Sequence, residues 1–142
     1  MKLESWGRYP KYPQAASPVW WPQQLDAAAL PQSFLPFGNG RSYGDVCLAS
    51  SNQLLTMRGL DRFVAFDRQT GVLRAEAGVT LGDILQVTVP AGWFLPVVPG
   101  TRLATLGGAI ANDVHGKNHH RQGTFGCHVN RFTLYRQGQW LE

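Results

Sequence analysis

The hydrophobic pattern of the chain contains one clear amphipathic stretch. Residues 80–90, "TLGDILQVTVP", repeat apolar side chains at the three- and four-residue spacing of an α-helix. Thr80 and Asp83 have the spacing of an N-terminal capping box, and Pro90 marks the end of the pattern. The sequence therefore predicts a helix here, with a buried face formed by Leu81, Ile84, Leu85 and Thr88.

Most other apolar positions form short runs that end at glycine, aspartate or proline. This is the pattern of strands joined by turns, and "DRQTG" is the clearest turn. A second turn signal, "RQGQ", predicts that another strand begins at the end of the sequence. The runs predict strands within residues 52–57, 63–67, 71–78, 93–100 and 128–135.

The beginning of the chain has a different composition. Residues 1–22 are rich in proline and aromatic side chains, which favours an extended segment, and residues 22–31 form a short helical pattern bounded by prolines. Trp6, Trp20 and Trp21 are expected to cover the core or a partner domain. Helical and strand patterns together predict an α+β fold.

Composition limits the function classes. A chain of 142 residues with 44% hydrophobic residues forms one domain or part of a larger one. The net charge of +4 is the balance of ten arginines and three lysines, scattered along the chain, against nine acidic residues, which suits a recessed anion better than nucleic acid. Cys47 and Cys127 are outside any CxxC motif and are expected to be free thiols in a reducing compartment.

The sequence also bears on location. It shows no signal peptide and no apolar run long enough to span a membrane, so a cytoplasmic or membrane-peripheral location is expected.

The candidate chemistry lies in two glycine-rich stretches. The first, "GNGRSYGD" at residues 38–45, has glycines at 38, 40 and 44 that allow positive φ, so that consecutive N–H groups can bind phosphate oxygens. It lacks the spacing of a Walker loop and the acidic residue of a dinucleotide-binding fingerprint. A plain glycine-rich turn between strands is the alternative.

The second stretch, "PGTRLATLGGAIAND" at residues 99–113, predicts a short helix capped by Thr105. Gly107 and Gly108 leave its backbone bare, which permits close approach of a flat or phosphorylated ligand. Tight packing of the helix against a strand is the alternative explanation for these glycines.

A cluster of polar residues follows at 112–121. His115 and His119 are four residues apart, but Gly116 lies between them and no HExxH motif is present, so no metal site is predicted. Ser42 and the two cysteines lack the context of a catalytic nucleophile. The remaining interpretation is a site that places hydrogen-bond donors and positive charge beside a large flat cofactor.

The two stretches "GNGRSYGD" and "PGTRLATLGGAIANDVHGKNHHRQGTFGCHV" resemble the FAD-binding domain of the vanillyl-alcohol-oxidase, or PCMH-type, FAD-linked oxidoreductases. Within this family the sequence is most similar to the branch that oxidises a polyprenyl-phosphate-linked ribose, and "SWGRYP" is similar to the start of that branch. The resemblance implies an α+β fold of two small α/β subdomains. It also implies that residues 1–142 are an incomplete, N-terminal part of a longer flavoenzyme whose substrate or cap domain is absent.

The resemblance also implies roles for individual residues. The histidine that tethers FAD in many relatives is replaced by Arg41, so FAD is expected to bind non-covalently. His115 and Lys117 match residues beside the flavin and the substrate and are the expected catalytic residues, whereas His119, His120 and Arg121 are expected at the rim. The expected cofactor contacts are Gly38, Asn39, Gly40, Arg41, Ser42, Tyr43, Gly44, Asp45, Gly100, Thr101, Thr105, Leu106, Gly107, Gly108, Asn112, Asp113, Val114 and His115.

The function implied is oxidation of a sugar alcohol, such as the 2'-OH of a polyprenylphosphoryl ribose, by hydride transfer to flavin N5. The expected partners are a small-molecule or lipid-linked sugar and a short-chain dehydrogenase that completes an epimerisation. A non-catalytic flavin- or nucleotide-binding module is the alternative, and nucleic-acid binding is disfavoured because no RRM or KH signature is present.

Overall fold

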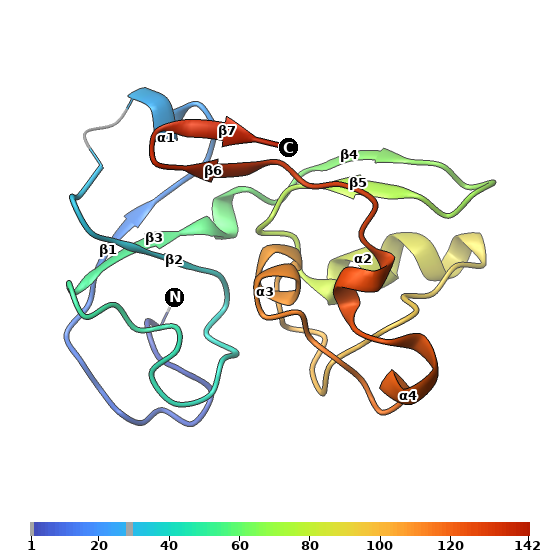
Figure 1. The fold of residues 1–142 in the computed structure, drawn as a ribbon, viewed down its shortest axis with the longest axis horizontal. Helices are drawn as coiled ribbons and strands as arrows, with labels where there is room; N and C mark the ends of the chain where they lie inside the picture. Colours follow the sequence, from blue (N-terminus) through green and yellow to red (C-terminus); the bar gives the residue numbers. More distant parts are fainter. Residues whose placement is uncertain (1, 28–29) are drawn as a thin grey trace.

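The computed structural model describes residues 2–27 and 30–142 and divides into two lobes (Figure 1). The first lobe holds a parallel sheet in the order β1-β3-β2, and the second holds the β4–β5 hairpin and most of the helices. A hairpin of β6 and β7 lies over the first lobe.

The strands are β1 Ala15–Pro18, β2 Leu35–Phe37, β3 Gln53–Thr56, β4 Phe63–Phe66, β5 Leu73–Ala75, β6 Leu134–Arg136 and β7 Gln139–Leu141. The α-helices are α1 Gln24–Ala27, α2 Leu81–Thr88, α3 Leu106–Ala111 and α4 His119–Gln122. Three 3-10 turns are η1 Met57–Gly59, η2 Val89–Ala91 and η3 Phe125–His128.

The central strand β3 has both of its faces covered. Leu54 and Leu55 are neighbours whose side chains point to opposite faces, and both are almost fully buried. Leu54 packs in a cluster with Phe37, whereas Leu55 packs in a separate cluster with Val19. Burial on both faces is typical of a parallel sheet and explains why this strand reads as an apolar run.

The second lobe is built around α2, which confirms the helix predicted from the sequence. Leu81 and Ile84 are each 1% exposed and pack with Val79, Val97, Ala109 and Phe125. The capping box is present, because the Thr80 hydroxyl accepts from Asp83 N at 3.1 Å and Asp83 Oδ2 accepts from Thr80 N at 3.1 Å. The helix that supplies Leu81 and Ile84 to this core is therefore stabilised at its N-terminal end by a complete capping box.

The capping box makes stability depend on pH. The pKa of the Asp83 carboxyl is lowered, first by the hydrogen bond from the Thr80 hydroxyl, because that bond favours the charged form. The contribution is complete above the unfolded pKa of about 3.9 and is lost as pH falls through the lower folded pKa. We expect urea unfolding from pH 6 to 3 to show a smaller loss of stability for Asp83→Asn than for the parent. Equal losses in both proteins would contradict this.

Most of the other predicted elements are confirmed. Strands form within 52–57, 63–67 and 71–78, and β7 follows the turn at Gln137 and Gly138. The helix between Pro22 and Pro31 is observed as α1, and residues 28–29 of that prediction lie outside the described residues.

Two predicted strands are wrong. Residues 93–100 form no strand, because Pro96 and Pro99 have no N–H to donate to a ladder, and Val97 is instead fully buried in the core of the second lobe. Of residues 128–135, only the last two belong to a strand, since among the described residues no neighbouring strand pairs with 129–133.

The three N-terminal tryptophans are not core residues in this chain. Trp6, Trp20 and Trp21 are 50%, 55% and 56% exposed. The Arg62 guanidinium lies 3.6 Å from the ring centroid of Trp21 and also pairs with Glu76 at 3.0 Å. The indoles are therefore held at the surface by cationic partners or backbone contacts, and a role against a partner domain stays a prediction.

No helix in the part of the chain that the structure describes is long and apolar enough to cross a membrane.

Candidate functional site

The two glycine-rich stretches meet in the structure although about sixty residues separate them. The backbone at Gly38 lies against Thr105, where an added Cβ would be 2.5 Å from the Thr105 hydroxyl oxygen. The Asn39 amide donates to the Leu103 carbonyl at 2.9 Å. The loop at 38–45, here called the first loop, therefore contacts the segment that leads into α3.

The first loop has backbone N–H groups without hydrogen-bond partners among the described residues. Among the described residues, none of the N–H groups of residues 38–45 donates a hydrogen bond to another group. Gly40 and Gly44 have φ of 62° and 56°, so the prediction of positive φ is confirmed at these two positions and wrong at Gly38. Arg41 is held by its Nε donating to the Asn39 carbonyl at 2.7 Å, and Tyr43 is 77% exposed. A run of unpaired N–H groups around left-handed glycines has the chemistry of an anion-binding nest.

The helix α3 begins as predicted. The Thr105 hydroxyl accepts from Gly108 N at 3.2 Å and caps the helix. Gly107 packs closely on Ala77, where an added Cβ would lie 2.9 Å from the Ala77 Cβ, and its N–H donates to the Ala77 carbonyl at 2.8 Å. Close packing therefore accounts for Gly107. Among the described residues, an added Cβ at Gly108 would meet only the capping hydroxyl, and one at Gly100 would meet no atom within 4 Å.

The turn after α3 is held in place by hydrogen bonds. Asp113 adopts a φ of 42°, and its carboxylate accepts from Gly126 N at 2.8 Å. Val114 N donates to Ala109 O at 3.1 Å, and Val114 O accepts from Phe125 N at 2.8 Å. His115, the next residue, forms a β-bridge with Thr124. His115 therefore has a defined backbone position beside the end of α3.

The two predicted catalytic side chains are both accessible. His115 and Lys117 are exposed, and the His115 ring lies 5.6 Å from the ring of His119 in an edge-on arrangement. The His119 Nδ1 is 3.1 Å from the Gly116 carbonyl. His120 and Arg121 lie on the same short helix, α4, and are exposed. The structure thus gathers the cluster on one turn and helix, and it places His119 next to His115.

Several predicted cofactor contacts have their side chains engaged within the protein. Leu106 and Val114 pack against the core of the second lobe, and Asn112 Nδ2 donates to Gly108 O at 2.8 Å. The Thr101 hydroxyl accepts from Leu103 N at 3.1 Å. Leu106 and Val114 can contact a ligand chiefly through their backbone.

The predicted sites sit at the two ends of α3. The first loop contacts the N-terminal end, and His115 follows the C-terminal end, which is about 9 Å away for a helix of this length. Within residues 2–27 and 30–142, no group of three histidine, cysteine or acidic side chains is arranged to hold a metal ion. An elongated cofactor suits this arrangement better than a compact one.

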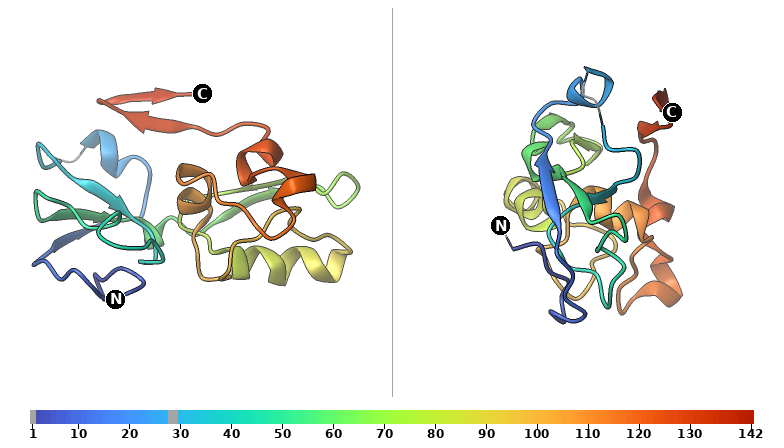
Figure 2. Two further views of the ribbon diagram at one scale, coloured as in Figure 1. Left: turned by 60° about the horizontal axis from the view of Figure 1, so that its bottom comes forward. Right: turned by 90° about the vertical axis from the view of Figure 1, so that its left-hand side faces the viewer.

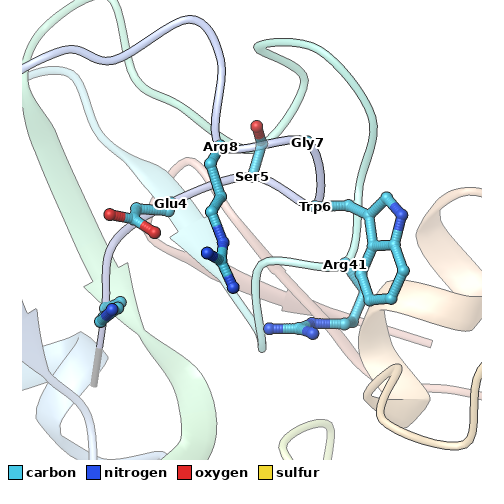
Figure 3. Close-up of a pocket in the computed structure, with 7 residues that line it drawn as sticks. Glu4, Ser5, Trp6, Gly7, Arg8 and Arg41 are labelled. Carbon is cyan, nitrogen blue, oxygen red and sulfur yellow. The ribbon is translucent and has the colours of Figure 1, made fainter.

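The N-terminal segment contacts the first loop, a role that the sequence pattern did not predict. The Arg41 guanidinium lies 5.3 Å from the Trp6 ring centroid (Figure 3). Trp6 N donates to Ser42 O at 2.9 Å, and Gly40 packs directly on the Glu4 carbonyl. Nothing in the spacing of residues 4–8 indicates this contact. The segment therefore braces the first loop.

Cys127 is a free thiol as expected, but its location beside Thr124 was not predicted. This exposed thiol lies 3.6 Å from the Thr124 hydroxyl, and Thr124 pairs with His115. The hydrogen bond from Thr124 lowers the pKa of the Cys127 thiol, whereas burial raises the pKa of the other free thiol, Cys47. Neither cysteine forms a disulfide among the described residues.

Comparison with known proteins identifies the fold. The profile of the FAD binding domain family matches residues 25–138. The decaprenylphosphoryl-beta-D-ribose oxidase of Mycolicibacterium smegmatis is 43% identical over 97 residues, which are 68% of this chain and 21% of that protein. A D-lactate dehydrogenase of Anaerostipes hadrus is 27% identical over 74 residues, 52% of this chain and 15% of that protein.

A solved structure of alkyldihydroxyacetonephosphate synthase superposes with a TM-score of 0.65 at 19% identity, covering 77% of this chain and 21% of that one. The chain thus spans between 15% and 21% of the length of these proteins. The mixed α/β architecture agrees with that of these neighbours, and the cofactor is FAD. The chain therefore belongs to the FAD binding domain family, with the fold of a PCMH-type FAD-binding domain.

Proposed function

We propose that residues 1–142 form the N-terminal, FAD-binding part of a longer flavoenzyme that oxidises an alcohol group of a sugar. The specific candidate substrate is the 2'-OH of a polyprenylphosphoryl ribose. The name of the 43% identical relative, a decaprenylphosphoryl-ribose oxidase, supports this substrate class. In this proposal the substrate or cap domain is a further part of the same enzyme.

One observation carries the cofactor assignment. The N–H groups of residues 38–45 are free of partners among the described residues, and the loop that bears them packs on Thr105 at the start of α3. Phosphate oxygens are the acceptors that such a nest binds, and FAD contains a pyrophosphate. The residues present therefore fit the cofactor, with the pyrophosphate at the first loop and the flavin toward His115.

In this proposal His115 and Lys117 bind and orient the substrate. FAD supplies a hydride acceptor at flavin N5. His115 can accept a hydrogen bond or a proton from the reacting hydroxyl, because its side chain is exposed and its backbone is fixed by the bridge to Thr124. Lys117, also exposed, can attract a phosphate of the substrate as a compact positive charge.

The proposed reaction implies a partner. Oxidation of a carbinol gives a ketone, and inversion of that carbon requires a second enzyme that returns a hydride to the opposite face. A short-chain dehydrogenase performs reductions of this class, so we propose one as the functional partner.

The test of the function is anaerobic reduction of the bound flavin in the full-length enzyme. We expect a polyprenylphosphoryl ribose to bleach the oxidised flavin absorbance, and D-lactate to leave it unchanged. Lys117→Ala should raise KM for the phosphate-bearing substrate more than it lowers kcat. Stable flavin binding without reduction by any sugar alcohol would instead support a non-catalytic flavin-binding module.

The attachment of FAD can be tested separately. Arg41 occupies the position of the tethering histidine of relatives, so the cofactor should be held by non-covalent contacts alone. We expect acid precipitation of the loaded protein to release all of the flavin into the supernatant, as measured by its fluorescence. Flavin that stays with the washed precipitate would show that the prediction is wrong.

A further inference from the structure

A cavity of about 420 Å³ lies between the N-terminal segment and the first loop (Figure 3). Its volume falls in the range of small-molecule sites, about 300–1,000 Å³. The residues around it come from only two stretches of chain, which are joined by the hydrogen bond from Trp6 N to Ser42 O. The side chains that matter for its charge are Lys2, Glu4, Arg8 and Arg41, and the Trp6 ring supplies an apolar wall.

The two arginines reach toward the same region. Arg8 sits at the end of a turn closed by its N–H and the Ser5 carbonyl at 3.1 Å, with a φ of 57°. In Figure 3 its side chain extends toward the guanidinium of Arg41. Arg41 is itself positioned by the Asn39 carbonyl and the Trp6 ring. Two guanidinium groups are thus presented at the cavity by separate backbone segments.

These charges are not neutralised within the described part of the chain. The ion pairs there join Arg62 to Glu76 and Arg131 to Glu142, and neither involves a residue of the cavity. Three cationic side chains and the single carboxylate of Glu4 leave the cavity with an excess of two positive charges. Planar guanidinium groups in a recess favour phosphate, which they can bind through two parallel hydrogen bonds.

We propose that this cavity binds the phosphate group of a small molecule, at a site separate from the N–H groups of the first loop. The proposal rests on Lys2 and Arg8 of the N-terminal segment, whereas Arg41 borders the cavity but is itself an expected contact of the cofactor. Ser5 also lines the cavity and its buried hydroxyl has no partner among the described residues, but Figure 3 shows that hydroxyl on the far side of the backbone from the two guanidinium groups. The site does not depend on the alcohol oxidation proposed above.

The test uses the full-length enzyme loaded with FAD, so that the first loop is occupied. Inorganic phosphate and ribose 5-phosphate are titrated separately and followed by calorimetry and by tryptophan fluorescence, with Trp6→Phe identifying the signal of the cavity wall. We expect Arg8→Gln to weaken phosphate binding about tenfold and to leave FAD content unchanged. Lys11→Gln is the matched control, because Lys11 carries the same charge on the same segment and does not line the cavity. Tighter binding of ribose 5-phosphate than of inorganic phosphate would identify a sugar phosphate as the source of the group, and the reverse order would identify the free ion.

Two results would overturn the proposal. If Arg8→Gln releases FAD and the loaded protein binds no phosphate, the positive charge serves the pyrophosphate of the cofactor and there is no separate site. If Lys11→Gln weakens phosphate binding as much as Arg8→Gln does, the attraction is a property of the basic surface. In that case raising the salt concentration should abolish the binding in all variants alike.

Discussion

Replacing His115 by alanine in the full-length enzyme is expected to slow reduction of the bound flavin by roughly two to four orders of magnitude, the range for a positioned acid–base group. The flavin content should change much less, because the first loop lies at the other end of α3. Stopped-flow absorbance during anaerobic mixing with a sugar substrate measures the rate. A flavin-to-protein ratio from the same sample measures the content.

His119→Ala is the control for this prediction. The His119 ring lies only 5.6 Å from the ring of His115, so the control removes a neighbouring imidazole of the same size. We assign His119 to the rim and expect the rate to stay within a few fold of the parent. If His119→Ala proves as damaging as His115→Ala while FAD remains bound, the assignment within this cluster is wrong.

Gly40→Ala is expected to destabilise the first loop by about 2–5 kcal/mol. About 1–2 kcal/mol comes from a side chain at positive φ, and about 1–3 kcal/mol from forcing the new Cβ against the Glu4 carbonyl and the Phe37 ring. Because this conformation presents the free N–H groups proposed to bind the pyrophosphate, we expect FAD to be lost on gel filtration. The measurement is the flavin-to-protein ratio before and after the column, together with urea unfolding.

Gly44→Ala is the matched control, since Gly44 has nearly the same φ of 56° but, within the part of the chain that the structure describes, no atom within 4 Å of an added Cβ. It should cost only the backbone strain and keep most of the FAD. Equal losses in the two variants would show that the contact with the N-terminal segment contributes nothing to the site.

Interactions between residues close together in the sequence made many of the helices and strands predictable. The helix over 80–90 could be predicted to within a turn because the capping box and the apolar repeat act within a few residues of each other. The same holds for Thr105, whose hydroxyl caps the next helix. The strands at 53–56, 63–66 and 73–75 were predictable because each apolar run ends at a turn signal.

The pairing of strands that are far apart in the sequence could not be predicted in the same way. An apolar run becomes a strand only when another strand offers it a hydrogen-bonding edge, and residues 129–133 have no such neighbour among the described residues. The run at 93–100 has the hydrophobicity of a strand, yet its prolines and the core packing of Val97 keep it irregular.

For the site, the sequence by itself determined which residue types are available: two glycine-rich stretches, a histidine and lysine cluster, and an arginine at position 41. It also determined the family, because both motifs occur together. Only the tertiary structure decided that Gly38 meets Thr105, that Gly107 is used for packing on Ala77, and that Trp6 and Glu4 hold the first loop. The physical reason is that such contacts join residues far apart in the chain, where no periodicity or spacing rule links one side chain to the other.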